Sequence, residues 1–268
     1  MALRWTGKII GAGLGFMSGR WLGMVFGILI GHSYDRGAGT SFSKKDNKLE
    51  GLQSEFSNAT FLVMGKLAKS DGAVNDSELD LARNIMSRLR HTEKQRLEAM
   101  RLFSEGKQDE FDVVPVLVSL KSLIGRRVAL SQFFLETQLS LAYADGPLNS
   151  GERKVLQVIC VNLGINKIQF EIINKRVTAQ FNFQRYRQQK ASGPSIGQLA
   201  NAYTILDVDK SDSDADIKKS YRKLMNQHHP DKLVARGLPP EMQVLAKEKS
   251  QEIQQAYTLI RNSRKTSK

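Results

Sequence analysis

A histidine, a proline and an aspartate stand together near the C-terminus, as His229-Pro230-Asp231. They follow a basic segment with helical periodicity that ends near His228. Proline lacks an N–H and its ring clashes with the preceding helical turn, so the helix stops here and His229 is restricted to extended backbone. The pattern therefore predicts a rigid bend that presents an imidazole and a carboxylate side by side. Such a bend is suited to contacting another protein.

The same imidazole invites two other interpretations, a metal ligand and a general base. Either one needs further ligands or partners around it. The neighbouring His228 projects in a different direction, and no cysteine or third histidine lies near the pair in the sequence. We therefore expect no catalytic residue, no enzymatic activity and no cofactor.

The segment before the bend is predicted to be an amphipathic helix that opens at the capping signal Ser213-Asp-Ala-Asp216. Its apolar positions recur at helical spacing: Ile217, Tyr221, Leu224 and Met225. Off that face lie two like-charged pairs four residues apart, formed by Lys218, Lys219, Arg222 and Lys223. A solvated face usually mixes both signs, so this single-sign cluster predicts a docking surface for an acidic partner.

A loop over Asp231–Pro240 and a long helix over Glu241–Arg261 are predicted to follow the bend. Two helices joined by a loop, with their apolar faces together, form an antiparallel hairpin. A short apolar helix precedes them, beginning at Asn201. Residues 184–200 are polar and basic and contain Ser-Gly-Pro-Ser, which is typical of a linker.

Three motifs of this C-terminal region, residues 201–268, together resemble the J domain of DnaJ-type co-chaperones. They are Tyr221-Arg-Lys-Leu224, His229-Pro-Asp231-Lys232 and Gln251-Glu-Ile-Gln-Gln-Ala-Tyr257. The resemblance implies that His229, Pro230 and Asp231 trigger ATP hydrolysis in a DnaK-type Hsp70. It also implies that an acidic patch of that partner receives Lys218, Lys219, Arg222, Lys223 and Lys232. The Gly/Phe-rich segment and zinc domain of DnaJ have no counterpart here, so client holding by such parts is not expected.

Residues 56–183 show helical periodicity without a competing strand pattern, which predicts an all-α middle domain. One motif occurs twice in it, offset by 74 residues: an Asp-Gly turn, an apolar residue and then Asn-x-x-Glu. The Asn and Glu of each copy fit a capping box at a helix start. The alternative is a site for a hard cation, for which the oxygen ligands would be Asp71, Glu78, Asp145 and Glu152. The paired motifs resemble the TerB-like, tellurite-resistance-type helical domain, for which metal binding is a suggestion.

Ile9 to Gly31 is apolar apart from Ser18 and Arg20. At about 1.5 Å rise per residue, this length covers the roughly 30 Å hydrocarbon core of a bilayer. A cleaved signal peptide would have a shorter apolar stretch and a small-residue cleavage site. We therefore predict a single transmembrane helix over 9–31, after a tail of residues 1–8 and before a linker of residues 32–55. Basic residues after it weakly favour a periplasmic N-terminus and a cytoplasmic bulk at the bacterial inner membrane.

Glycine recurs at every fourth position of this segment, from Gly7 to Gly31. Small residues at this spacing let two membrane helices approach closely. The repeat predicts a homodimer through a glycine row whose central members are Gly11, Gly15, Gly19, Gly23 and Gly27. The alternative is that glycine is simply common in membrane helices.

The net charge of +13 is spread thinly and forms no block of five or six like charges. A basic nucleic-acid arm would show such a block, so we expect no nucleic-acid partner, whereas anionic membrane lipid suits the charge near the N-terminus. The single Cys160 excludes an internal disulfide framework.

The order of an anchor, a TerB-like domain and a terminal J domain resembles the bacterial membrane-anchored DnaJ-like co-chaperones. It implies a protein that recruits a DnaK-type Hsp70 to the inner membrane and to envelope-stress signalling. The alternative is a regulatory scaffold or stress sensor that acts through a metal- or partner-binding TerB-like domain.

Overall fold

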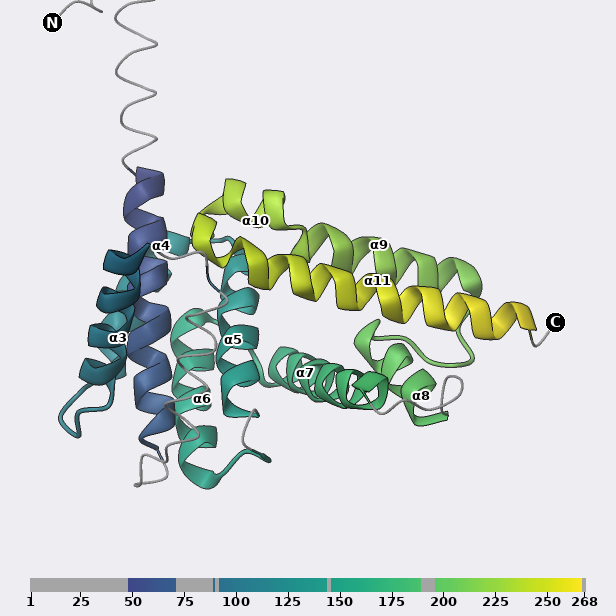
Figure 1. Cartoon of the computed structure of the whole chain (residues 1–268), viewed down its shortest axis with the longest axis horizontal. Coiled ribbons are helices and arrows are strands. Elements are labelled where there is room, and N and C mark those ends of the chain that lie inside the picture. Colours follow the sequence, from purple (N-terminus) through teal and green to yellow (C-terminus); the bar gives the residue numbers. More distant parts are fainter. Residues whose placement is uncertain (1–47, 71–88, 90–91, 144–145, 189–195, 267–268) are drawn as a thin grey trace, which may run out of the picture. The chain divides into compact units, whose positions relative to one another are not determined.

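The computed structural model describes residues 48–70, 89, 92–143, 146–188 and 196–266, and within these ranges every regular element is a helix (Figure 1). Residues 48–68 are helical. The later elements are α3 (Glu93–Gly106), α4 (Val113–Ile124), α5 (Val128–Ala142), α6 (Ser150–Leu163), α7 (Lys167–Gln188), α8 (Ile196–Ile205), α9 (Asp214–His228), α10 (Pro230–Arg236), the 3-10 helix η2 (Pro240–Met242) and α11 (Gln243–Thr266). The predicted all-α class is confirmed.

The core of the middle domain is organised around α5. This helix buries apolar side chains on all sides, as expected for a helix without a polar face, and its fully buried residues include Leu130, Phe133, Phe134, Leu135 and Leu139. Helices α4, α6 and α7 pack against it or against one another. The ring of Phe134 meets that of Phe56 edge-on, with centroids 5.5 Å apart. One charged residue, Glu136, lies within this buried helix.

Two glycines let the helix over residues 48–68 approach α3 at backbone distance. A Cβ on Gly65 would lie 2.2 Å from the Phe103 carbonyl oxygen, and one on Gly106 would lie 2.0 Å from that of Leu62. No side chain fits at such distances, so both positions require glycine. The two helices thereby close one side of the core.

Helices α9 and α11 form the predicted hairpin and lie side by side in Figure 1. The Ser213 hydroxyl accepts the Asp216 N–H at 3.1 Å and caps α9, as the sequence predicted. Ile217 and Leu224 are buried between α8, α9 and α11, together with Ile253 and Ile260 of α11. The long second helix begins at Gln243 and ends at Thr266, slightly later than its predicted bounds.

The two expected domains share their cores. Helix α7 continues to Gln188, through residues expected in the linker, because Ala179 and Phe183 are buried in the same apolar cluster as α8, α9 and α11. Likewise, residues 196–200 belong to α8 rather than to a linker. Residues Leu52–Lys268 form one compact unit. The J-domain region is therefore packed onto the middle domain.

The segment expected to be an open loop over Asp231–Pro240 is instead largely structured. It contains α10 and leads into η2, and Gly237 ends α10 with a φ of 113°. Leu233 and Leu238 are fully buried and belong to the apolar core that is built around α5. The prediction of a plain loop was wrong because this segment has a buried apolar partner that lies far away in the sequence.

Candidate functional site

The His-Pro-Asp bend lies between α9 and α10, as its residue types predicted. His229 ends the first helix and caps the second, with the extended backbone angles φ −61° and ψ 124°. Its Nδ1 accepts the Asp231 N–H at 3.2 Å. Pro230 occupies the first position of α10, where a missing N–H costs nothing. The backbone of the bend is therefore fixed by the sequence of the bend itself.

The Asp231 carboxylate is exposed to solvent beside the bend. Its Oδ1 accepts a hydrogen bond of 3.1 Å from Nε2 of Gln243, the first residue of α11. The next residue, Lys232, is also exposed, and its ammonium contacts the Asn226 side-chain oxygen. Gln243 thus orients the carboxylate without covering it.

The predicted basic face is an exposed surface of α9. Lys218, Lys219, Arg222 and Lys223 are all exposed, while Ile217 and Leu224 on the other face are buried. Among the residues that the structure describes, none of these four cations takes part in an ion pair. Within the described ranges the face is therefore a positive surface without an ion-pair partner, and an acidic surface of another protein would complement it.

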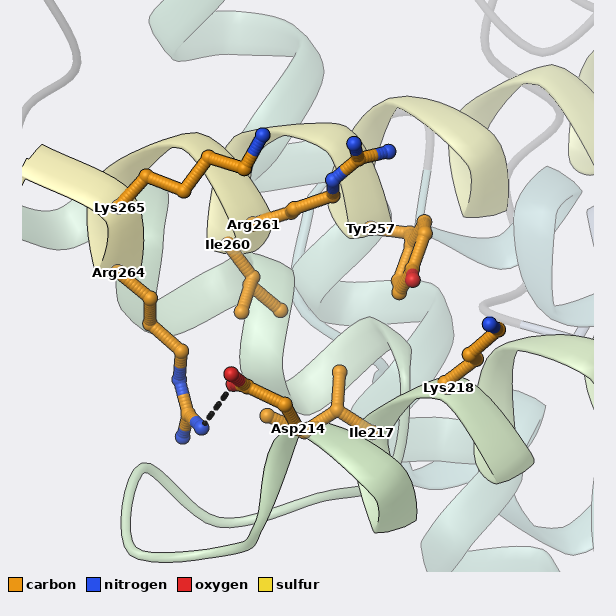
Figure 2. A pocket seen from close by; sticks show the side chains of 8 residues that line it. All are labelled: Asp214, Ile217, Lys218, Tyr257, Ile260, Arg261, Arg264 and Lys265. Carbon is orange, nitrogen blue, oxygen red and sulfur yellow. Dashed lines mark hydrogen bonds and ion pairs between the residues drawn. The ribbon is translucent and has the colours of Figure 1, made fainter.

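A pocket lined by both charged and apolar side chains lies between the start of α9 and the end of α11 (Figure 2). Arg264 binds across it, pairing with Asp214 at 2.9 Å and donating to the Lys210 carbonyl at 2.6 Å and the Tyr203 hydroxyl at 3.0 Å. Lys218 and Arg261 also line the pocket. These contacts secure the end of the hairpin remote from the bend.

A cluster of four titratable side chains is buried directly behind the bend. His228, the last residue of α9, and Glu136 of α5 have side chains 4% and 1% exposed. The Glu136 Oε2 lies 3.6 Å from His228 Nδ1 and 3.4 Å from the ammonium of Lys249 on α11. Its Oε1 lies 3.5 Å from Nη1 of Arg176 on α7. One carboxylate thus contacts three basic side chains from three different helices.

Burial and mutual charge set the protonation of this cluster. Burial lowers the pKa of His228 to about 4, because the protonated form would lose its water and face two cations. Burial opposes ionisation of Glu136, but the neighbouring His228, Lys249 and Arg176 outweigh it, so the pKa of Glu136 lies below its usual value. At neutral pH the site holds a carboxylate, two cations and a neutral imidazole. Neither nitrogen of His228 makes a hydrogen bond within the described residues.

Sequence reasoning missed this cluster, although one signal pointed to it. Glu136 directly follows the apolar run Phe133-Phe134-Leu135 in α5, and a charge at such a position needs a partner in the core. Nothing in the sequence indicated that Arg176, His228 and Lys249 would supply that partner. The expectation that the two adjacent histidines project differently is confirmed, since His228 is buried and His229 lies at the surface bend.

The second copy of the repeated motif forms the predicted capping box. The Asn149 side chain accepts the Glu152 N–H and the Glu152 carboxylate accepts the Asn149 N–H, both at 2.8 Å. Asp145 and the first copy, with Asp71 and Glu78, lie outside the described residues. Within the described part of the chain, no three His, Cys, Asp or Glu side chains are grouped to hold a metal.

The predicted transmembrane helix and its glycine row also lie outside the described residues. Of the helices that the structure does describe, none has both the length and the apolar character needed to span a bilayer.

The hairpin of α9 and α11, the short helix α8 and the fixed His-Pro-Asp bend define a J-domain protein. The family model of the DnaJ domain matches residues 201–268, that of the tellurite resistance protein TerB matches 57–175, and that of the co-chaperone DjlA transmembrane domain matches 1–45. The chain belongs to the family of the co-chaperone protein DjlA and carries the membrane-anchoring domain of that family.

Three curated relatives illustrate the match, and each is described as co-chaperone protein DjlA. That of Coxiella burnetii is 40% identical, covering 98% of this chain and 99% of the relative. That of Vibrio cholerae is 42% identical (96% and 98%), and that of Escherichia coli O157:H7 is 39% identical (98% and 99%). No solved structure gave a significant match.

The buried cluster predicts that the free energy of unfolding falls as the pH is lowered from 7.5 to 5.5. Because the pKa of His228 falls from its usual 6.5 to about 4 on folding, only the unfolded chain takes up this proton between those values. Stability is therefore lost as the pH falls below 6.5. We expect urea unfolding of the full chain in mild detergent to give a free energy roughly 1 kcal/mol lower at pH 5.5 than at pH 7.5.

The variant His228→Gln removes this titration. Its free energy of unfolding should therefore differ less between pH 5.5 and pH 7.5 than that of the wild type. The lowered pKa of Glu136 reduces stability only at pH values below its ordinary pKa, and the raised pKa of the half-buried Glu252 acts in the opposite direction. The contribution of His228 is therefore the difference in pH dependence between the wild type and the variant, because both proteins contain Glu136 and Glu252. Equal slopes for the wild type and the variant would contradict the assignment.

Proposed function

We propose that this chain is a membrane-anchored co-chaperone that stimulates the ATPase of a DnaK-type Hsp70 and recruits it to the inner membrane. The observation that carries the proposal is that one helical hairpin exposes both a fixed bend and a cationic face. Asp231, just after the bend, is exposed, and so are the four cations of α9, which make no ion pair within the described residues. The family to which the chain belongs supports the same function.

The protein needs no chemistry of its own for this task. Lys218, Lys219, Arg222 and Lys223, with Lys232, attract and orient an acidic surface of the Hsp70. The bend then brings His229 and Asp231 against the partner. A ligand shifts an equilibrium only by its differential affinity for two states. The bend must therefore bind more tightly to the Hsp70 conformation that hydrolyses ATP.

Reconstitution of the full chain in lipid vesicles tests this proposal. A purified DnaK-type Hsp70 is mixed with vesicles that contain the protein or with empty vesicles, in the presence of ATP. We expect the steady-state hydrolysis rate to rise only with the protein, and the Hsp70 to float with those vesicles during density centrifugation. Unchanged hydrolysis over a full titration would refute the function, whatever the flotation result.

The topology and self-association of the anchor belong to the same proposal. A single span with a periplasmic N-terminus would place the bulk of the chain, and with it the J domain, in the compartment of a cytoplasmic Hsp70. The glycine row would then pair two chains through Gly11, Gly15, Gly19, Gly23 and Gly27. Such pairing would present two bends at one membrane site.

The glycine row makes a separate prediction. Gly15→Leu with Gly19→Leu should weaken self-association in a membrane dimerisation assay, because bulky side chains prevent close backbone approach. A suitable control is Leu14→Ile with Leu22→Ile, which preserves size and hydrophobicity in the same segment. Equal dimerisation of all three proteins would show that the glycines reflect composition alone.

A further inference from the structure

The bend is attached to the middle domain on its N-terminal side. His228, one residue before the bend, is buried against Glu136 of α5 at 3.6 Å, and its carbonyl accepts the Ser250 hydroxyl at 2.7 Å. Lys249, which precedes that serine, reaches the same carboxylate. The end of α9 and the adjacent turn of α11 therefore share one anion of the middle domain.

The bend is attached on its C-terminal side as well. Leu233 and Leu238 are fully buried in the core that surrounds α5, and the Leu238 carbonyl accepts the Gln53 side-chain amide at 3.4 Å. Gly237 lies so close to the middle domain that an added Cβ would be 2.3 Å from a methyl group of Leu52. These contacts hold the segment immediately after Asp231 and Lys232.

This attachment leaves the recognition surface open. Asp231, Lys232 and the basic face of α9 are all exposed while His228, Leu233 and Leu238 are buried. The packing therefore does not occlude the trigger. It fixes the backbone on both sides of the trigger and directs the recognition side chains to solvent.

We propose that Glu136 is a positioning residue for Hsp70 activation, through which the middle domain holds the His-Pro-Asp bend in its binding geometry. The inference rests on the proposed co-chaperone function. At neutral pH, Glu136 is the one acid of the cluster and faces Lys249, Arg176 and the neutral His228. Its loss removes the buried carboxylate that Arg176 and Lys249 share, which strongly disfavours the packed arrangement.

A bend that is ordered before binding loses less conformational freedom when the partner docks. Release of the segment from His228 to Leu238 should therefore weaken productive binding. The apolar cluster of α8, α9 and α11 does not include Glu136, so the hairpin itself should persist. The expected effect is a higher protein concentration for half-maximal stimulation, with a smaller change in the maximal rate.

The test titrates full-length protein in nanodiscs against the ATPase of a DnaK-type Hsp70. For Glu136→Gln we expect the half-maximal concentration to rise about fivefold or more, as for the loss of order in one or two side chains. Amide hydrogen exchange over residues 228–243 should become faster in the same variant. The matched control, Glu171→Gln, makes the same change at an exposed site of α7 and should leave both quantities unchanged.

Two further variants keep the proposal decidable if Glu136→Gln fails to fold. Leu238→Ala loosens the other attachment without changing any charge, and should also raise the half-maximal concentration and speed exchange. Replacing Glu136, Arg176 and Lys249 together with leucine or methionine removes the charges but restores a balanced apolar contact. This triple variant should recover wild-type titration.

The outcomes separate the positioning role from the function on which it rests. If the wild type stimulates and His229→Gln does not, the co-chaperone function stands. A folded Leu238→Ala variant with a wild-type half-maximal concentration then overturns the positioning role, as would stronger stimulation than that by the wild type. If the wild type itself does not stimulate, the function fails, and the positioning role falls with it.

Discussion

Replacing His229 with glutamine should reduce stimulation of the Hsp70 ATPase to the rate of the Hsp70 alone. His229 joins α9 to α10 and accepts the Asp231 N–H through its ring. Glutamine has no ring of this shape, so it loses both the fixed presentation and the recognition surface of the imidazole. Removing one partner of a desolvated polar contact typically costs about 2 kcal/mol or more, which corresponds to at least roughly thirtyfold in the affinity for the activated state. Steady-state hydrolysis over a full titration of protein measures the loss.

Asp231→Asn extends this prediction to the charge of the trigger. The amide has the same shape as the carboxylate and can still accept from Gln243, so the bend should keep its structure. Stimulation should nevertheless be lost, because the proposed trigger acts through the negative charge of the carboxylate. Asp207→Asn provides a matched control at another exposed aspartate of the same domain. Full stimulation by either His229→Gln or Asp231→Asn would mean that the bend is not the trigger.

The bend and the basic face could be predicted from the sequence because both depend on local physics. A proline inside a helical run breaks or kinks the helix, so Pro230 sets the end of α9. The positions of Ile217 and Leu224 determine which side of α9 faces inward. The charges of Lys218 and Arg222 are then exposed by the geometry of the helix alone. The Asn149 capping box is local in the same way, and the structure confirms it.

The buried cluster and the attachment of the bend could not be predicted in this way. Glu136, Arg176, His228 and Lys249 come from four helices, and their spacing in the chain contains no sign that they meet. The sequence that contains Leu233 and Leu238 is typical of a loop, because the apolar surface that buries these two side chains belongs to the middle domain. The extension of α7 to Gln188 has the same cause, since Phe183 is buried against helices that follow it in the chain.

This difference bears on how the protein should be dissected. A fragment that begins near residue 196 would retain the bend and the cluster of α8, α9 and α11, but it would expose Leu233 and Leu238. It would also leave His228 and Lys249 without Glu136. Assays on such a fragment would measure the activity of a bend that is no longer held by the middle domain. The full chain is the proper object for measuring stimulation.

Reversing charge on α9 should weaken the docking of the Hsp70 without removing the trigger. Lys218→Glu with Arg222→Glu places two acids on an exposed face whose other members are Lys219 and Lys223. Charge complementarity chiefly raises the association rate and guides orientation. We therefore expect the half-maximal concentration to rise about tenfold or more at roughly 0.1 M ionic strength, while the rate at saturation stays close to that of the wild type. This pattern differs from the loss of stimulation expected for His229→Gln.

Salt and stability supply the controls for this prediction. The wild-type half-maximal concentration should rise with added salt, and that of the reversed variant should rise less or fall, because screening removes attraction in one and repulsion in the other. The free energy of unfolding of the variant should change by no more than about 0.5 kcal/mol, since the like-charged pair at positions 218 and 222 is exchanged for another like-charged pair. Lys154→Glu with Lys175→Glu makes the same net change on exposed sites of α6 and α7 and should bind as the wild type does. If both double variants raise the half-maximal concentration equally, the effect is due to net charge, and α9 is not the docking surface.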